Sequence, residues 1–369
     1  MRPAIPPDDR VTSPTMSPDR NDLQLAALMV HRGYLDGQVG RKVAQRVAAG
    51  EDLQSALQAE GLPAERALWL VETRAGQQPR IPGFDVGRRL GQGGTAEVFE
   101  ALERKTGRQI VIKILMPLAA HQRGTLKAFV EEGKRLAELQ IQGLVRGFGV
   151  ARFGEVVFSK QERLKGRTLQ EVLDEQGQLP EARALSIVLQ VAETLGRLAR
   201  QGLVHRDVKP GNIIVDGGDR ATLIDLGFCA GVQEKCNSGQ AVGTAEYLSP
   251  EQAMGGAQAD IRSDIYSLGV TLFQLTVGRL PFEGRQSEEV LRQHVMQSLR
   301  SPELQGRGVS PSVQYLIEKM MAKDADIRFQ NYGELIAEVR GLIEGQKRPD
   351  FTQGQRPAPP RSARPRRRR

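Results

Sequence analysis

Two short polar segments in the second half of the chain carry the residues best suited to chemistry. The first reads HRDVKPGN, from His205 to Asn212, and the second reads DLG, from Asp225 to Gly227. They combine two acids, an amide and a lysine at spacings suited to phosphoryl transfer, a reaction in which the protein mainly positions phosphates and neutralises their charge.

A glycine-rich segment upstream could bind phosphate. It consists of Leu90, Gly91, Gln92, Gly93, Gly94, Thr95, Ala96, Glu97 and Val98. Closely spaced glycines let backbone amides approach phosphate oxygens, because no Cβ stands in the way. Taken alone, the segment fits an ordinary tight turn equally well. Lys113, fifteen residues after Val98, ends an apolar strand and could point a cation into a cleft beneath the glycines.

Hydrophobic patterning predicts the elements that must position these residues. Residues 84 to about 157 alternate apolar and polar side chains around one helical stretch, 126–140, which predicts a small β-rich lobe. From residue 169 onward the period is helical, which predicts a larger helical lobe. Its expected helices are 185–201, 263–277, 311–322 and 332–343.

The flanks differ from this central region. No hydrophobic period is found in residues 1–20, and residues 346–369 are of low complexity. Both segments are predicted to be disordered, the second as a basic tail. Residues 21–82 are predicted to form a small helical region and a linker, with three or four short helices over 21–74. This region is either a bundle packed on the main domain or a dedicated docking or regulatory module.

The formal charge of +8 belongs to the tail. From Lys347 onward there are nine Lys or Arg against one Asp, so the rest of the chain is nearly neutral. The tail could contact nucleic acid, anionic lipid or acidic partners through charge alone, or be merely solvated. Its arginine run has no interleaved aromatic residues that would indicate base stacking. The two cysteines, Cys229 and Cys236, are too few for a disulfide framework. With no apolar signal core and no long apolar run, we expect a cytoplasmic chain without a membrane span.

Taken together, these motifs make residues 84–343 similar to a protein kinase domain, with the bacterial eukaryotic-like (Hanks-type) serine/threonine branch as the best fit. The resemblance implies a two-lobed α+β kinase fold, with a small β-rich N-lobe and a larger helical C-lobe, and here a small N-terminal helical appendage. It implies ATP and Mg²⁺ as cofactors, proteins as substrates, and possible self-association for autophosphorylation.

The resemblance also assigns roles to residues. Lys113 would hold the α and β phosphates and pair with Glu132, which fits the family's offsets better than Glu131. Asp207 would accept or orient the proton of the attacking hydroxyl, and Lys209 would stabilise the transferring phosphoryl group. Asn212 and Asp225 would bind Mg²⁺ through hard oxygen atoms.

The acceptor residue is indicated by a third motif. The run GTAEYLSPE, from Gly243 to Glu251, resembles the substrate-binding loop of Ser/Thr kinases, in which Thr244 shapes the floor beneath the substrate hydroxyl. In the family Glu251 pairs with a late arginine, here Arg328, and Asp264 ties the catalytic loop to a central helix. Two other readings remain open, a catalytically impaired scaffold and a small-molecule phosphotransferase, although the latter would normally lack this loop.

Some residues depart from the family pattern or suggest regulation. Leu226, Val111 and Ala96 replace the commoner phenylalanine, alanine and glycine, and none of them removes an essential group. Ser238 is a candidate phosphosite whose phosphate would pair with Arg206, or it is an ordinary loop serine. Cys229 and Cys236 could form a redox-sensitive bridge in the same segment, or stay reduced and inert.

Overall fold

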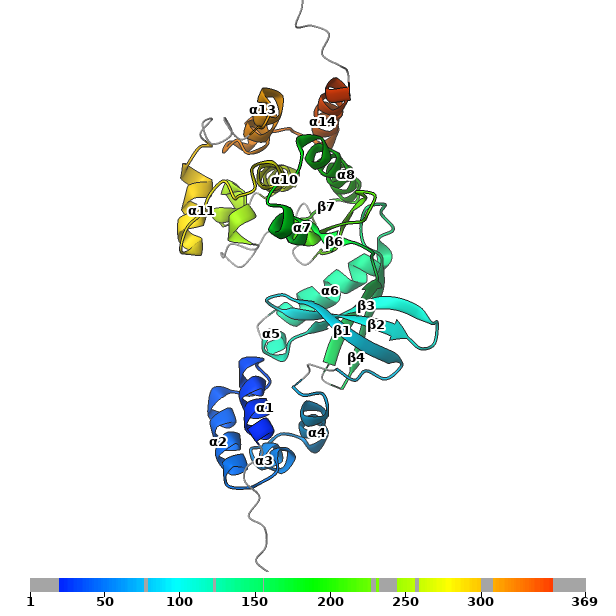
Figure 1. The fold of residues 1–369 in the computed structure, drawn as a ribbon, viewed down its shortest axis with the longest axis vertical. Coiled ribbons are helices and arrows are strands. Elements are labelled where there is room, and N and C mark those ends of the chain that lie inside the picture. The colour runs from blue at the N-terminus through cyan, green and yellow to red at the C-terminus, as the bar shows by residue number, and fades with distance from the viewer. Residues whose placement is uncertain are drawn as a thin grey trace, which may run out of the picture. The chain divides into compact units, whose positions relative to one another are not determined.

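The computed structural model describes residues 20–75, 79–121, 124–154, 156–226, 230–231, 244–255, 259–299 and 308–347 (Figure 1). They form two compact units. The first contains the described residues up to Gln140 together with Val145–Lys165, and the second contains Ile141–Leu144 and the described residues from Gly166 onward.

The described part of the first unit begins with four short helices, within the predicted number. They are α1 (Arg20–His31), α2 (Gly37–Ala48), α3 (Leu53–Ala59) and α4 (Ala64–Glu72). Asp36 and Asp52 start α2 and α3 as N-caps, since their side chains accept the backbone amides of Gln38 and Ser55. The helices surround a core of their own, which includes Met29, Val43, Leu57 and Leu70.

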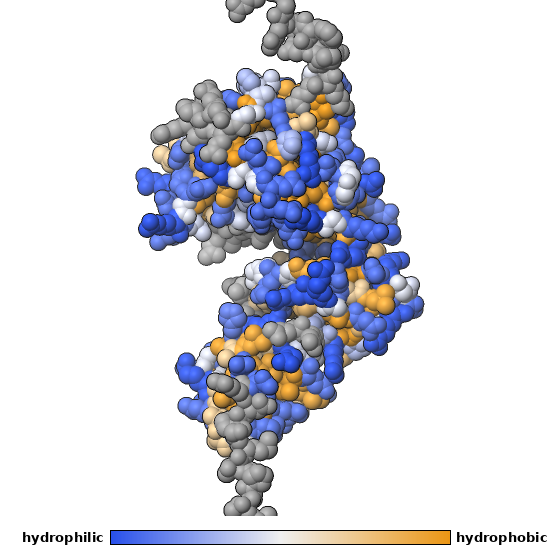
Figure 2. Space-filling view, viewed as in Figure 1, coloured by the Kyte–Doolittle hydropathy of each residue, from blue (hydrophilic) through white to orange (hydrophobic). Residues whose placement is uncertain are grey.

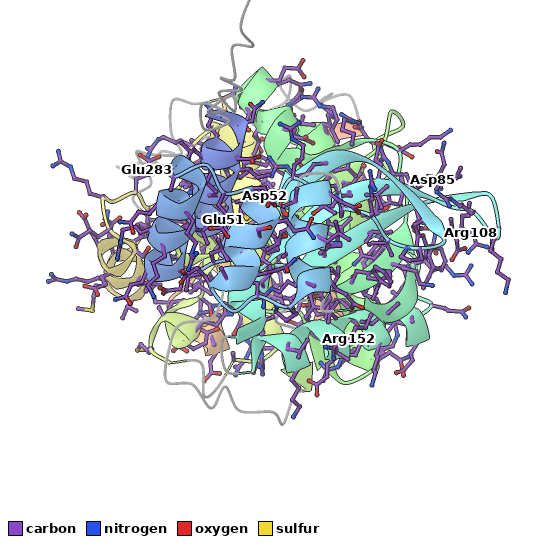
Figure 3. The ribbon with its side chains drawn as sticks, turned by 90° about the horizontal axis from the view of Figure 1, so that it is seen from below. Glu51, Asp52, Asp85, Arg108, Arg152 and Glu283 are labelled. Atoms are coloured by element: carbon purple, nitrogen blue, oxygen red, sulfur yellow. The ribbon has the colours of Figure 1, made fainter. Side chains whose placement is uncertain are left out.

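Hydrophobic side chains also reach the surface of these helices. Figure 2 shows them beside hydrophilic ones, and Leu68 of α4 is 42% exposed. In Figure 3 the labelled Glu51 and Asp52 lie at the start of α3. Throughout the described residues, no helix is both long and apolar enough to cross a membrane.

A five-stranded antiparallel sheet follows among the described residues of this unit, in the order β1-β2-β3-β5-β4. Its strands are β1 (Phe84–Gln92), β2 (Ala96–Glu103), β3 (Arg108–Leu115), β4 (Gly147–Phe153) and β5 (Val156–Glu162). The unit also contains α5 (Pro117–His121) and α6 (Thr125–Glu138). The predicted β-rich lobe with one main helix is therefore found, with the short α5 in addition.

The register of the sheet decides which side chains share a face. Val98 lies opposite Lys113, while its neighbour Glu97 lies opposite Ile114. Because side chains alternate along a strand, Val98 and Lys113 share one face and Glu97 lies on the other. Asp85 and Arg108 project outward at the strand ends far from the glycine-rich turn (Figure 3).

The second unit is mainly helical. Its longer helices are α7 (Leu169–Gln176), α8 (Glu181–Arg200), α10 (Ile261–Val277), α11 (Ser287–Met296), α13 (Pro311–Met320) and α14 (Tyr332–Lys347). Its short elements are β6 (Arg167–Thr168), β7 (Leu203–Val204), η1 (Pro210–Asn212), β8 (Ile213–Val215), β9 (Ala221–Leu223), β10 (Ala230–Gly231), η2 (Ala245–Tyr247), α9 (Pro250–Ala253) and η3 (Ala325–Ile327). Helix α10 is buried from Ser263 to Val277, which makes it the central helix of this unit.

Some predicted boundaries need correction. Helix α8 begins at Glu181, four residues before the predicted start. Pro180 can directly precede it, since a proline at a helix start costs no intrahelical hydrogen bond. Helix α14 continues to Lys347, so the predicted tail cannot begin at residue 346. Helix α1 likewise includes Arg20, which was predicted to be disordered. Terminal turns of a helix need no apolar residue, so hydrophobic periodicity places them poorly.

Buried His294 makes the second unit sensitive to acid. Its Nδ1 lies 2.9 Å from the Tyr266 hydroxyl and its Nε2 lies 3.0 Å from the Glu246 carbonyl. Burial, and next the charge of Lys323, lower the pKa of His294 from 6.5 to about 4. The unfolded chain therefore binds a proton between these values that the folded chain does not, and stability is lost as the pH falls from 6.5 to 4.

In His294→Gln we expect the free energy of unfolding to fall by about 3 kcal/mol less than in the unsubstituted chain as the pH drops from neutral to 4. This is the free-energy equivalent of the pKa shift. Urea unfolding at a series of pH values from neutral to acidic measures it. His31→Gln serves as the control, because His31 is exposed at the end of α1. Parallel pH profiles of His294→Gln and the unsubstituted chain would contradict the prediction.

Candidate active site

The glycine-rich segment forms the turn between β1 and β2. The amide of Gly93 donates to the carbonyl of Ala96 at 2.8 Å, and Gly91 pairs with Val98. None of Gly91, Gly93 and Gly94 has a left-handed φ, so the backbone conformation does not require glycine here. A Cβ added to Gly91 or Gly94 would meet no protein atom within 4 Å. What the glycines leave is open space beside backbone amides, as a phosphate site needs.

Lys113 of β3 and Glu132 of α6 form a buried ion pair in the first unit. Nζ of Lys113 lies 2.9 Å from Oε1 of Glu132, and the two side chains are 16% and 7% exposed. Glu131 instead lies near Lys127 on the exposed face of α6. The structure thus brings Glu132, and not Glu131, to Lys113, because Glu132 shares the buried face of α6 with Phe129 and Leu136.

Two glycines that sequence reasoning missed allow α6 to lie close to the sheet. A Cβ on Gly133 would be 2.3 Å from Cγ2 of Val150, and a Cβ on Gly147 would be 2.6 Å from the backbone of Leu136. Gly133 directly follows Glu132, so this close approach sets the depth at which the carboxylate meets Lys113. The available signal was a glycine in the middle of a predicted helix, which usually has a packing reason.

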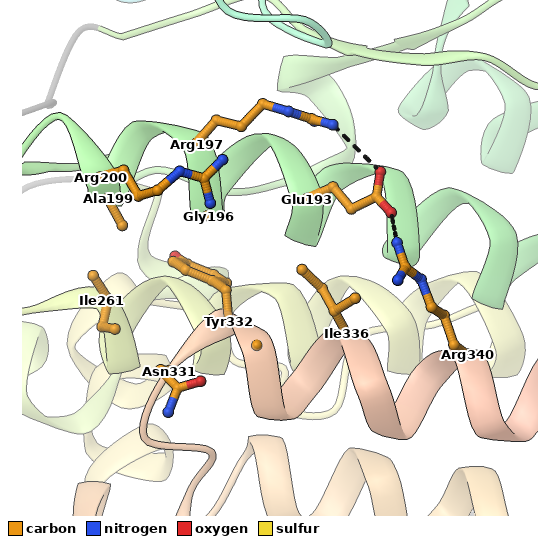
Figure 4. Close-up of a pocket in the computed structure, with 11 residues that line it drawn as sticks. Glu193, Gly196, Arg197, Ala199, Arg200, Ile261, Asn331, Tyr332, Ile336 and Arg340 are labelled. Carbon is orange, nitrogen blue, oxygen red and sulfur yellow. Dashed lines mark hydrogen bonds and ion pairs between the residues drawn. The ribbon is translucent and has the colours of Figure 1, made fainter.

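In the second unit, Asp264 of α10 fixes the backbone of the HRDVKPGN segment. Its carboxylate accepts the amides of His205 at 2.8 Å and Arg206 at 2.7 Å, and the Tyr332 hydroxyl lies at 3.3 Å. Tyr332 also lines a pocket between α8 and α14 (Figure 4). The pKa of Asp264 is raised above its ordinary value, because burial outweighs the opposing effects of His205, the backbone amides and Tyr332.

Arg206 adopts a left-handed φ of 67°, which is strained for a residue with a side chain. Its amide is held by Asp264, and its carbonyl accepts Nε2 of Gln252 at 3.0 Å. Gln252 was also missed. Its sequence signal was the Ser249-x-x-Gln252 capping box that starts α9, which the structure contains. The loop conformation ahead of Asp207 is therefore held from two sides.

Asp207 lies at the centre of a cluster of the predicted residues. Its Oδ2 is 2.7 Å from Nζ of Lys209 and 2.9 Å from Nδ2 of Asn212. The amide and hydroxyl of Thr244 approach Oδ1 at 3.4 and 3.5 Å, at the long end of hydrogen bonding. Lys209 also donates to the Thr244 hydroxyl. The structure thus brings Asp207, Lys209, Asn212 and Thr244 together.

The donor set of Asn212 and Asp225 fits a hard divalent cation. Nδ2 of Asn212 is used by the carbonyl and carboxylate of Asp207, both at 2.9 Å, which leaves the amide oxygen as the atom for a metal. The amide of Ile224 donates to the backbone carbonyl of Asn212 at 3.1 Å. Because Asp225 is the next residue after Ile224, this bond keeps the backbone of Asp225 near that of Asn212. Within the described ranges no cluster of three or more His, Cys, Asp or Glu could hold a metal. A two-ligand site would therefore rely on phosphate oxygens and water.

Glu251 and Arg328 form the pair that the resemblance implies. Their side chains make two hydrogen bonds of 2.7 and 2.9 Å, and Ser263 donates to the same carboxylate at 2.6 Å. Burial alone acts to raise the pKa of Glu251. The hydrogen bonds and charge of Arg328 and the hydrogen bond from Ser263 together outweigh burial, so the pKa of Glu251 lies below its ordinary value. This pair supports the end of the substrate-binding loop.

The regulatory candidates Ser238, Cys229 and Cys236 lie outside the described residues, as does Gly227 of the DLG motif. The remaining predicted site residues fall into two groups. Leu90–Val98, Lys113 and Glu132 belong to the first unit, and Asp207, Lys209, Asn212, Asp225 and Thr244 belong to the second.

Comparison with known proteins identifies the class to which this site belongs. The model of the protein kinase domain matches residues 84–337. The chain therefore belongs to the protein kinase family, and the predicted family and two-lobed fold class are confirmed.

The relatives that the chain resembles include bacterial serine/threonine kinases. The chain is 30% identical to a probable serine/threonine-protein kinase of Streptomyces coelicolor, over 73% of this chain and 42% of the relative. It is 31% identical to a probable serine/threonine-protein kinase of Clostridium perfringens (71% and 38%), and 30% identical to serine/threonine-protein kinase PknB of Mycolicibacterium smegmatis (71% and 43%). The chain spans about two fifths of the length of these relatives.

Proposed function

We propose that the chain is a serine/threonine protein kinase that transfers the γ-phosphate of ATP to hydroxyl groups of proteins, including itself. The observation that carries this proposal is the cluster in which Asp207 is held with Lys209, Asn212 and Thr244. Such a cluster can receive a hydroxyl group, accept its proton and stabilise the phosphoryl group that it attacks.

Each residue has one task in this proposal. Asp207 orients the substrate hydroxyl and takes its proton, and its position is kept by the Asn212 amide and the Asp264-bound loop. Lys209 offers a cation beside Oδ2 of Asp207, where negative charge on the transferring group must be stabilised. Thr244 contacts both side chains and so links the substrate loop to the reacting centre.

The first unit binds the nucleotide. The backbone amides of the glycine-rich turn approach the phosphates of ATP, and Lys113, oriented by Glu132, contacts the α and β phosphates. Mg²⁺, which we assign to the oxygens of Asn212 and Asp225, neutralises phosphate charge when it is bound. Among regulatory features, Ser238 as a phosphosite and the basic tail as a contact for acidic partners stay predictions.

The test is transfer of labelled phosphate from γ-labelled ATP to the chain itself and to a basic acceptor protein, with and without Mg²⁺. Acid hydrolysis then identifies the labelled amino acid. We expect Mg²⁺-dependent labelling of serine or threonine. Labelled phosphotyrosine would contradict the assigned acceptor class, and label found only on a small molecule would favour a small-molecule phosphotransferase.

A further inference from the structure

Arg32 occupies an unusual place for an arginine. It follows the last residue of α1 and is 8% exposed, although arginine is rarely buried without a specific partner. Its guanidinium donates hydrogen bonds to two acceptors. Nη1 donates to the carbonyl of Ala75 at 2.9 Å, and Nη2 donates to Oε1 of Glu97. Arg32 thus joins the N-terminal helices to a strand of the sheet.

The acceptor Glu97 belongs to the glycine-rich segment. It is 3% exposed, and its second cationic partner is Arg89 of β1, with Nη1 at 2.9 Å. The Arg89 side chain is 47% exposed, whereas that of Arg32 is 5% exposed, so Arg32 is the buried partner. A buried carboxylate depends on such a partner, because loss of one member leaves the other charged and desolvated.

The sheet register links this contact to the nucleotide-binding face. Glu97 pairs with Gln92, the last residue of β1, and precedes Val98, which lies opposite Lys113. Arg32 therefore holds β2 from the face opposite to that of Lys113. Any shift of Glu97 would move both Val98 and the turn formed by residues 93–95.

We propose that Arg32 is a positioning residue through which the N-terminal helices hold the glycine-rich turn in the conformation that binds ATP. This inference rests on the proposed function, since it assigns ATP to that turn. The sequence allowed two interpretations of the helical region, a packed bundle or a docking or regulatory module. The role of Arg32 favours the regulatory one.

The backbone at the end of the helices supports the same role. Arg74 and Ala75 have left-handed φ values of 50° and 54°, a conformation that non-glycine residues adopt at a cost. The carbonyl of Ala75 nevertheless accepts Arg32, and its amide donates to the Leu70 carbonyl at 2.7 Å. One side chain therefore ties together the turn after α1, the segment after α4 and β2. By linkage, ATP binding must stabilise this arrangement as much as the arrangement favours ATP.

The experiment measures the dissociation constant of a non-hydrolysable ATP analogue with Mg²⁺, using the full chain and its variants. Arg32→Gln and Glu97→Gln are each expected to raise it by about fivefold or more, the lower range of coupling between linked sites. The double variant should bind no more weakly than the weaker single variant, because both changes break the same contact. In the transfer assay, Arg32→Gln should raise KM for ATP and leave kcat within about twofold.

Two matched arginines serve as controls. Arg46 pairs inside the helical region with Glu60 at 2.9 Å, and Arg88 of β1 pairs with Glu100 at 3.1 Å. Arg46→Gln and Arg88→Gln remove the same charge without touching Glu97, and both should bind the analogue within about twofold of the unsubstituted chain. If Arg32→Gln does not fold, Glu97→Gln tests the contact from the other side.

The proposal is overturned if Arg32→Gln and Glu97→Gln bind the analogue as the unsubstituted chain does, or if Arg46→Gln weakens binding equally. Binding needs no phosphoryl transfer, so the two proposals are separable. An unsubstituted chain that binds the analogue but transfers no phosphate contradicts the kinase proposal, while the comparison of binding constants still decides the role of Arg32.

Discussion

Asp207→Asn is expected to slow phosphoryl transfer by about 10³-fold, within the range that general-base catalysis contributes. Asparagine keeps the size of the side chain but cannot take the proton of the attacking hydroxyl. It would also bring an amide group toward Lys209 and Asn212, whose nitrogen atoms now donate to Oδ2 of Asp207. The rate of labelled phosphate transfer at saturating ATP measures the loss.

Asp219→Asn is the matched control for this substitution. Asp219 lies in the turn between β8 and β9, has a φ of 57° that asparagine tolerates, and pairs with Arg183 at 2.9 Å. Its variant should keep the transfer rate within about twofold, as surface ion pairs contribute little. The assignment of Asp207 fails if Asp207→Asn transfers phosphate as fast as Asp219→Asn.

Arg328→Met is expected to lower the free energy of unfolding by about 3–5 kcal/mol. The Arg328 side chain is fully buried, and besides Glu251 it donates to the carbonyls of Ala322 and Lys323. Its loss would remove the cation and two hydrogen bonds from a buried carboxylate, which keeps its bond from Ser263, and would remove one donor from each of these carbonyls. Methionine fills the space but donates nothing. Urea unfolding of the purified variant gives the value.

Arg340→Met is the matched control for stability. Arg340 of α14 pairs with Glu193 of α8 at 2.5 Å (Figure 4), but its side chain is 56% exposed. This variant should lose no more than about 1 kcal/mol, as exposed ion pairs do. Equal losses in the two variants would show that burial of the Glu251–Arg328 pair is not what makes it important.

The same pair has a predictable pH dependence. In the folded chain the pKa of Glu251 is below its ordinary value of 4.5, so its contribution to stability is present above pH 4.5 and is lost as the pH falls through the folded pKa. Burial opposes this lowering of the pKa, and Arg328 contributes to the lowering through both its hydrogen bonds and its charge, with Ser263 adding a further hydrogen bond. The stability difference between Arg328→Met and the unsubstituted chain should therefore shrink as the pH falls below 4.5.

Much of the candidate site could be predicted because its residues are local in sequence. Asp207, Lys209 and Asn212 lie within six residues of one another, and a hydrogen-bonded loop brings them together. Glu132 was implied by the family's offsets relative to Phe129 and Leu136, and these three residues lie on the buried face of α6. The division into a β-rich and a helical lobe followed from the change of hydrophobic period.

The rest depended on contacts between distant residues of unexceptional type. Arg32 and Glu97 are 65 residues apart, and in sequence each is one charged residue among many. Gln252 reaches Arg206 across 46 residues. Hydrophobic periodicity tells which face of an element is buried, but not which charged side chain is buried with it, because that depends on how the elements pack.

Transfer of phosphate from ATP to protein can be tested by counting both products of the reaction in one experiment. The chain is incubated with ATP, Mg²⁺ and a basic acceptor protein, and the ADP formed is compared with the phosphoserine and phosphothreonine formed. We expect equal molar amounts of ADP and phosphorylated residues, both reduced by about 10³-fold in Asp207→Asn. ADP without phosphorylated protein, or nucleotide binding without any ADP, would contradict this expectation.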